Sequence, residues 1–183
     1  MNKIEKILDA IETDLLPLTR KGVAAGNHVF GGLVLDGETL VTVTAGTNNR
    51  CANPIYHGEI DTIMRFFALG ERPKPEHCIF VASHEPCSMC ASAIAWAGFR
   101  ELWVLFGAET MAAGFDMPVD LKMYRDVFGV NGIRAANSFY HKYELKREAA
   151  RENNVTELAQ KIKALEDEYA KLDVKDFEYP GMN

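Results

Sequence analysis

The sequence lacks the features of several large classes of protein. Its apolar runs are all far shorter than the ~20 residues that a membrane-spanning helix needs. The first residues lead into an amphipathic segment rather than an apolar signal core, so we expect a cytoplasmic protein that does not enter a membrane. We find neither an internal repeat nor a low-complexity linker in the 183 residues, a length that suits one domain with a full core.

Basic residues are outnumbered by acidic ones, 20 to 26, and cysteines are few. The formal net charge is −6, whereas proteins that hold nucleic acid usually display a basic surface, so a polynucleotide substrate is disfavoured. The four cysteines are Cys51, Cys78, Cys87 and Cys90. In a cytoplasmic chain of this length, a close pair of cysteines more often binds a metal ion or does redox chemistry than forms a structural disulfide.

The apolar pattern predicts helices and strands in alternation. Apolar residues at helical spacing over 4–16 predict an amphipathic helix that Pro17 ends. In chain order, the other predicted elements are strands at 28–35 and 39–45 joined by a hairpin turn, a helix at 57–70, a strand at 78–81, a helix at 86–98, a strand at 102–106, a short helix at 121–128 and an edge strand at 132–136. Helices that alternate with apolar strands after a hairpin indicate an α/β layer fold.

The character of the chain changes near residue 140. Residues 139–172 are charged, with sparse apolar positions, and predict a solvated helical tail that breaks near Asn153 and Asn154. We therefore expect a domain at 1–140 and a helical C-terminal extension at 141–183. The extension would pack on this domain or be swapped with it between subunits.

The most informative motif is split into two halves. His57-Gly58-Glu59 comes first, and Pro86-Cys87-Ser88-Met89-Cys90 follows about thirty residues later. One imidazole and two thiols are three good zinc ligands, one short of the four that a closed structural site uses. The carboxylate is not needed to hold zinc, but it is needed where a zinc-bound water must lose a proton. The combination therefore predicts catalysis.

Other interpretations remain open at this point. A Cys-x-x-Cys pair by itself is often a structural zinc half-site or a redox pair. Cys51, Cys78 or His84 could complete a four-ligand structural site, which would make the protein a zinc-binding domain without chemistry. Alternatively, His84 could line a pocket, because it lies close to the second half of the motif.

The two half-motifs resemble the signature of the cytidine deaminase-like superfamily of zinc deaminases. The resemblance covers roughly residues 31–116. It implies a three-layer α/β/α sandwich around a five-stranded mixed sheet, and a homodimer. It also implies one Zn²⁺ per subunit held by His57, Cys87 and Cys90, with Glu59 shuttling protons.

Residues outside the motif resemble two branches of this superfamily. His57-Gly58-Glu59-Ile60-x-Thr62 and Asn48-x-Arg50 are similar to fungal cytosine deaminases, in which the Asn contacts the substrate. Thr47-Asn48-Asn49 and Ala113-Gly114-Phe115-Asp116 resemble bacterial guanine deaminases, which often exchange C-terminal segments between subunits. The Asp-Pro-Thr-Ala that usually precedes the His is replaced here by Asn53-Pro54-Ile55-Tyr56.

The resemblance implies a hydrolase that removes the exocyclic amine of a small free nucleobase and releases ammonia, as in purine or pyrimidine salvage. Guanine or a guanine-like base is favoured, and cytosine is the alternative. Deaminases of tRNA adenosine share the motif pair but need a positive surface to hold RNA phosphates, which the acidic balance of this chain disfavours. The candidate substrate contacts are Asn48, Phe30, His84, Phe115 and Asp116.

Overall fold

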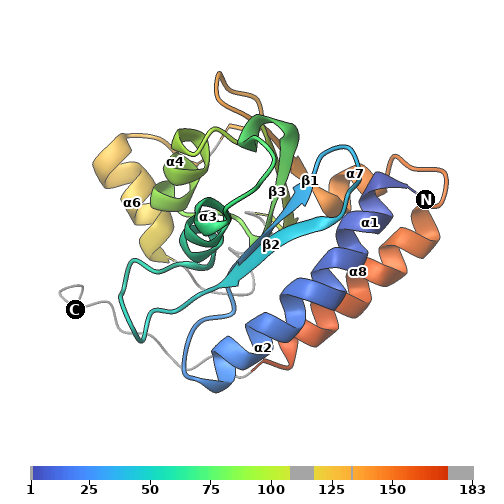
Figure 1. Ribbon diagram of the computed structural model, residues 1–183, viewed down its shortest axis with the longest axis horizontal. Helices are drawn as coiled ribbons and strands as arrows, with labels where there is room; N and C mark the ends of the chain where they lie inside the picture. The colour runs from blue at the N-terminus through green and yellow to red at the C-terminus, as the bar shows by residue number, and fades with distance from the viewer. Residues whose placement is uncertain (1, 108–117, 133, 173–183) are drawn as a thin grey trace.

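The computed structural model describes residues 2–107, 118–132 and 134–172 and consists of one sheet with helices on both faces (Figure 1). The sheet has five strands in the order β2-β1-β3-β4-β5. Their bounds are β1 (Gly31–Asp36), β2 (Thr42–Thr47), β3 (Cys78–His84), β4 (Glu101–Phe106) and β5 (His141–Glu144). β1 is antiparallel to β2 and β3, whereas β3, β4 and β5 are parallel, so the predicted five-stranded mixed sheet is confirmed.

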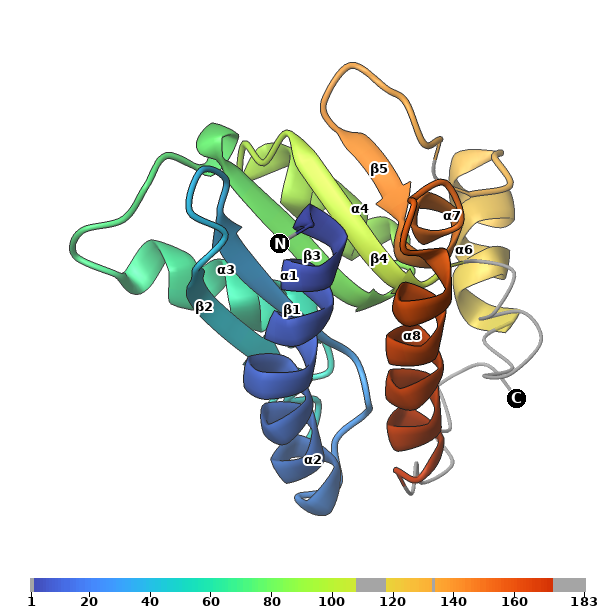
Figure 2. The ribbon, with the colours of Figure 1, turned by 90° about the vertical axis from the view of Figure 1, so that its right-hand side faces the viewer.

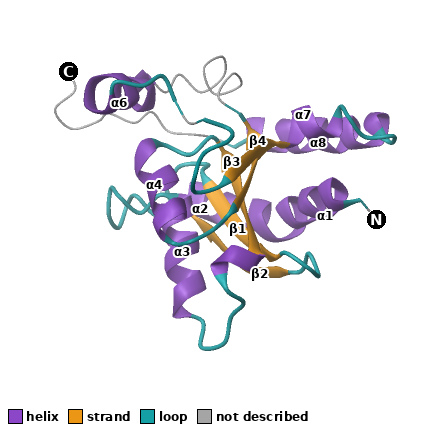
Figure 3. Ribbon diagram, turned by 90° about the horizontal axis from the view of Figure 1, so that it is seen from above, coloured by secondary structure: helices purple, strands orange, loops and turns teal. Residues whose placement is uncertain are grey.

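The helices cover the sheet from two sides (Figure 3). Their bounds are α1 (Lys3–Ala10), a π-helix (Ile11–Leu15), α2 (Leu16–Ala24), α3 (Gly58–Ala68), a 3₁₀ turn (Pro75–His77), α4 (Ser88–Trp96), α6 (Pro118–Phe128), α7 (Leu145–Ala149) and α8 (Val155–Ala170). The predicted helices at 57–70, 86–98 and 121–128 are confirmed as α3, α4 and α6, with ends that differ by a few residues. Within the described ranges, no helix is long and apolar enough to cross a membrane.

The prediction that Pro17 ends the first helix is wrong. α1, the π-helix and α2 continue into one another, and Pro17 lies in the first turn of α2 (Figure 2). A proline inside a regular α-helix lacks an N–H and clashes with the carbonyl of the preceding turn. The π-helical turn directly before Pro17 is wider, and it lets the helix continue past the proline.

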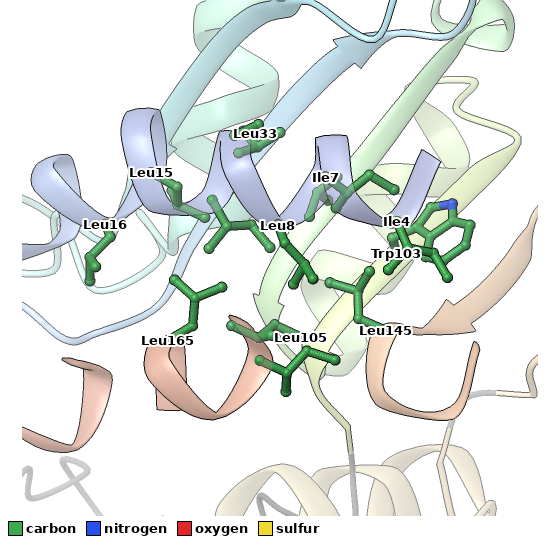
Figure 4. Packing of buried hydrophobic residues seen from close by; sticks show 14 of the residues in the cluster. Ile4, Ile7, Leu8, Leu15, Leu16, Leu33, Trp103, Leu105, Leu145 and Leu165 are labelled. Atoms are coloured by element: carbon green, nitrogen blue, oxygen red, sulfur yellow. The ribbon is translucent and has the colours of Figure 1, made fainter. Parts of the chain in front are cut away.

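Two apolar clusters hold the helices to the sheet. Figure 4 shows the larger one, in which Leu8 and Leu15 of the N-terminal helices lie near Leu105 of β4 and Leu165 of α8. The smaller cluster lies between the sheet and the pair α3 and α4, and its aromatic members are Phe66, Phe80, Phe99 and Tyr140. Each such side chain contributes about 1.5–3 kcal/mol when it is fully buried, so both helix layers are firmly held.

The C-terminal part of the described chain is not the solvated tail that the charge pattern predicts. β5 extends the sheet beside β4, and the side chains that α7 and α8 bury in the larger cluster are Leu145, Ala149, Leu158, Ile162, Leu165 and Tyr169. Within each helix these residues recur at three- or four-residue spacing, so one apolar face is enough to dock a helix whose other face is charged. The predicted break near Asn153 is confirmed, because α7 ends at Ala149 and α8 begins at Val155.

The predicted edge strand at 132–136 is also wrong. In the described part of that segment the structure has only an isolated bridge between Ala136 and His141. The edge strand next to β4 is β5 instead, which is shorter and more polar than the pattern for a strand requires. Its pairing with β4, rather than its own sequence, makes it a strand.

Candidate metal centre

Two helix N-termini meet at the carboxyl end of β3. His57 is the residue before α3 and Cys87 is the residue before α4, and both have extended backbone angles. Cys90 lies in the first turn of α4. Helix N-termini carry unpaired N–H groups and a partial positive charge, which favour thiolates over thiols. The fold therefore brings the two halves of the motif together.

The donor atoms of this group have the spacing of metal ligands. Ligand atoms of His57, Cys87 and Cys90 lie within 4.8 Å of one another, and the Cys87 Sγ lies 3.6 Å from the His57 Nδ1. Three atoms at these separations can each lie about 2.0–2.3 Å from one zinc ion. Among the described residues, no fourth His, Cys, Asp or Glu joins the group. The set thus fits a zinc ion with one position open to a small molecule.

The other candidates for a structural site lie elsewhere. Cys51 is exposed, and its Sγ lies 3.4 Å from the Gly26 carbonyl. Cys78 begins β3 at the opposite end from the metal group and donates to the Lys74 carbonyl at 3.3 Å. The structure therefore gives no support to a closed four-ligand site built with these two thiols.

The Glu59 carboxylate is buried beside the metal group. Its side chain is 4% exposed, and its Oε2 lies 3.4 Å from the Cys90 Sγ. Burial, reinforced by the nearby Cys87 sulfur, raises the pKa of Glu59 to about 7. This pKa belongs to the metal-free site, in which the buried carboxyl holds its proton more tightly than a carboxyl in water does.

The two thiols differ in their protonation before a metal binds. The hydrogen bond from Cys90 and the neighbouring His57 imidazole outweigh burial and lower the pKa of Cys87 to about 4. Donation to Cys87, together with burial, raises the pKa of Cys90 well above its usual range. The metal-free pair therefore holds one proton, and a zinc ion bound by both sulfurs has to displace it.

The start of β1 lies directly against the start of α3. A Cβ added to Gly58 would lie 2.4 Å from the Phe30 carbonyl oxygen and 2.5 Å from the Gly31 Cα. Only a glycine at position 58 permits this approach, which accounts for the middle residue of the first half-motif. The backbone of Phe30 therefore forms part of the support of His57 and Glu59.

Asn48 is buried next to Phe30, and its side chain has a defined orientation. Its backbone N–H donates to the Phe30 carbonyl at 2.8 Å. Its Oδ1 accepts hydrogen bonds from the backbone N–H groups of His28 at 3.3 Å and Arg50 at 3.1 Å. The amide oxygen is thus occupied by the protein, and the NH₂ group is what Asn48 can offer to a substrate.

His84 lies in an aromatic group behind Phe30. Its Nδ1 lies 2.9 Å from the Ser83 Oγ, and its ring centroid lies 4.9 Å from that of Phe30 and 4.6 Å from that of Phe106. Burial lowers the pKa of His84 to about 3, so the imidazole is neutral. His84 is therefore packed among aromatic rings, and the group of metal-ligand atoms in the described part of the chain does not include it.

Other residues near the site could not be recognised from the sequence. Tyr169 of α8 packs its ring 5.6 Å from that of His84, and Lys142 of β5 pairs with Glu85, two residues before Cys87. The helical spacing of Tyr169 marks it as a core residue but does not reveal its neighbours. Phe115 and Asp116 lie outside the described residues.

Comparisons with known proteins agree with this geometry. Residues 9–106 match the family model of the cytidine and deoxycytidylate deaminase zinc-binding region. The chain is 33% identical over 86 residues to a probable cytosine deaminase of Schizosaccharomyces pombe, covering 45% of this chain and 48% of that protein. It is 29% identical over 114 residues to a guanine deaminase of Bacillus subtilis, covering 60% and 70%.

The name of a third relative specifies an RNA substrate. The chain is 39% identical over 84 residues to a tRNA-specific adenosine deaminase of Agrobacterium fabrum, covering 45% of this chain and 52% of that protein. The matched region is thus about half the length of two of the three relatives. The solved structure of guanine deaminase from Bacillus subtilis has the same fold, with a TM-score of 0.51 at 24% identity over 90% of this chain and 93% of that one.

Proposed function

Because this chain belongs to the cytidine and deoxycytidylate deaminase family, we propose that it is a zinc-dependent hydrolase that removes the exocyclic amine of a small free nucleobase. One observation carries the proposal. Three metal-ligand atoms lie within 4.8 Å of one another and a buried carboxylate lies beside them, with no fourth protein ligand among the described residues. A structural site would close its coordination with a fourth side chain, whereas catalysis needs an open position.

Each residue of the centre has a role in this proposal. His57, Cys87 and Cys90 hold the zinc ion, which when bound lowers the pKa of a water molecule towards ~7. Glu59 takes a proton from the attacking water and delivers it to the ring nitrogen beside the attacked carbon. Glu59 then assists protonation of the departing amine, so that water and the amino-base are converted to the oxo-base and ammonia.

The substrate that we propose is guanine or a guanine-like base, held by Asn48 and by a wall containing Phe30 and His84. The Asn48 NH₂ group requires a hydrogen-bond acceptor, which a ring nitrogen or a carbonyl of the base supplies. The match to the guanine deaminase covers 60% of this chain, a larger share than the match to the probable cytosine deaminase. Cytosine is the alternative, since the identity to that second relative is 33%.

Two further alternatives have less support. A tRNA substrate would need a positive surface, and the net charge of the chain is −6. A zinc-binding domain without chemistry would leave the burial of Glu59 beside the metal group unexplained. Both remain outcomes of the experiment below.

We further propose a cytoplasmic homodimer that acts in base salvage, in which 1–140 form the deaminase domain and 141–183 extend it on the same chain, first with the strand β5 of its sheet and then with helices. Exposed apolar side chains on α4, α6 and the following loop support a dimer, because a patch of this kind usually marks a protein contact. These side chains are Trp96, Val127, Phe128, Val130 and Phe139. The contacts of α8 with α1 support packing of the extension on its own chain.

Ammonia release from guanine, cytosine, adenine, their nucleosides and tRNA, measured with the zinc-loaded protein, tests the proposal. We expect release from guanine, and expect Glu59→Gln to retain zinc while slowing release by at least ~10²-fold. Glu76→Gln is the matched control, because the Glu76 side chain is 53% exposed and distant from the centre. A Glu59→Gln variant with full activity would contradict the role of Glu59. Activity on tRNA alone, or no ammonia from any base, would contradict the proposed substrate.

A further inference from the structure

A buried ion pair lies beside the turn that carries Cys87. The Lys142 Nζ of β5 donates to the Glu85 Oε1 at 2.5 Å, and the two side chains are only 6% and 12% exposed. The Glu144 Oε1 lies 3.8 Å from the same Nζ. Most of the other ion pairs in the described ranges lie at the surface, where such pairs contribute little to stability.

Glu85 is joined to Cys87 by a very short piece of chain. Glu85 directly follows β3, and its backbone N–H donates to the Phe106 carbonyl at the end of β4, at 2.8 Å. The next carbonyl, that of Pro86, accepts from the Tyr124 hydroxyl at 3.2 Å. α4 begins immediately after Cys87. The Glu85 carboxylate and the Cys87 sulfur therefore belong to one short segment whose backbone is held to β4 and α6.

The ion pair orients the Glu85 carboxylate, which packing between apolar side chains would not do. Two charges out of water cost free energy, and an apolar pair of similar volume usually stabilises a core equally well. The second carboxylate oxygen of Glu85, Oε2, is buried and has no hydrogen-bond partner in the described part of the chain. The Glu85 side chain thus depends on Lys142 for its placement.

The position of Cys87 matters because its partner ligand belongs to another helix. Cys87 precedes α4 and His57 precedes α3, and their ligand atoms are 3.6 Å apart. Lys142 reaches Glu85, in the segment between β3 and α4, from the edge strand β5, which Figure 2 shows beside β4. Lys142 lies outside residues 9–106, the part of the chain that the family model matches.

We propose that Lys142 is a positioning residue for the zinc ligand Cys87, acting through the Glu85 carboxylate. The proposal rests on the zinc ligands proposed above. In this arrangement the edge strand β5 also helps to hold the zinc ligand Cys87 in place, through its residue Lys142. Groups that support metal ligands typically change metal affinity or activity by 10–100-fold when they are removed.

The test compares Lys142→Met, Lys142→Arg and the double variant Lys142→Met/Glu85→Met. Each variant is measured for zinc affinity by chelator competition, for the midpoint of urea unfolding, and for kcat and KM. Lys163→Met is the matched control, since Lys163 is 66% exposed in a surface pair with Asp167. We expect Lys142→Met to weaken zinc binding by about 10-fold and Lys142→Arg to recover most of it.

The double variant separates positioning from a purely structural role. Because no buried charge is left unpaired, its unfolding midpoint should return to that of the wild type while its zinc affinity stays low. Recovery of both properties would overturn the proposal, and so would a Lys142→Met variant with wild-type zinc affinity. If Lys142→Met does not fold, the unfolding midpoint and the zinc affinity of the double variant are compared with those of the wild type, and they decide in the same way. Zinc binding by Cys87→Ser at wild-type affinity would instead refute the ligand set, and so the two failures are distinguishable.

Discussion

Replacing Gly58 with alanine should disrupt the metal centre through the backbone of β1. The new Cβ would lie 2.4 Å from the Phe30 carbonyl oxygen and 2.5 Å from the Gly31 Cα, whereas ordinary contacts begin near 3.4 Å. One of the two segments must therefore move by about 1 Å.

The start of β1 is the less mobile of the two segments. The Phe30 carbonyl accepts from the Asn48 N–H at 2.8 Å, and the Gly31 N–H donates to the buried Ser83 Oγ at 3.0 Å. We therefore expect the first turn of α3 to move, and His57 and Glu59 to move with it. A displacement of 1 Å in catalytic groups can lower the rate by about 10²-fold, and overpacking costs about 1–3 kcal/mol of stability.

The assay is kcat/KM for ammonia release, together with zinc affinity and urea unfolding. Gly70→Ala is the matched control, because a Cβ at Gly70, just past α3, would meet nothing within 4 Å. We expect Gly70→Ala to behave as the wild type in all three measurements. A Gly58→Ala variant with wild-type zinc affinity and kcat/KM would refute the argument that β1 holds the two motif residues in place.

Three further outcomes follow from the site. Removal of zinc with a chelator should abolish ammonia release but leave the far-ultraviolet circular dichroism nearly unchanged, because both apolar clusters pack without it; unfolding would indicate a structural metal. Asn48→Asp keeps the oxygen that accepts two backbone N–H groups but loses the NH₂ donor, so kcat/KM should fall about 10–100-fold at unchanged zinc content, and an unchanged value would exclude the contact. Burial lowers the pKa of His84 to about 3, so below pH ~6.5 the unfolded chain binds a proton that the folded protein excludes. The contribution of His84 to stability should therefore be lost as the pH is lowered from ~6.5 to ~3, by up to ~1.4 kcal/mol per pH unit, and His84→Gln should remove that part of the slope in urea titrations.

The predictions from the sequence succeeded where a local pattern has one physical cause. Helical spacing located α3 and α4, and an apolar run located β4, because burial of one face or of both faces leaves these periods in the sequence. The prediction at Pro17 failed because a π-helical turn removes the clash that normally ends a helix. The tail prediction failed because charged residues on one face of α8 outnumber the apolar residues that dock it.

The sequence likewise predicted some features of the metal centre, whereas others appear only in the structure. The spacing of the motif indicated three ligands and a carboxylate, because zinc chemistry restricts the residue types that can serve. The need for glycine at position 58 appears only when β1 is seen against α3. The contact of Tyr169 with His84 and the pairing of Lys142 with Glu85 join segments far apart in the chain, and no local pattern records them.

The sequence by itself indicated the reaction class that we propose for this protein, because the two half-motifs contain the donor atoms and the acid–base group that the chemistry requires. The tertiary structure decided how those groups are held. The separation between His57 and Cys87 depends on where two helices begin against one sheet, and the environment of Glu59 depends on what buries it. Distance and burial are properties of packing between remote segments, which is why only the folded chain specifies them.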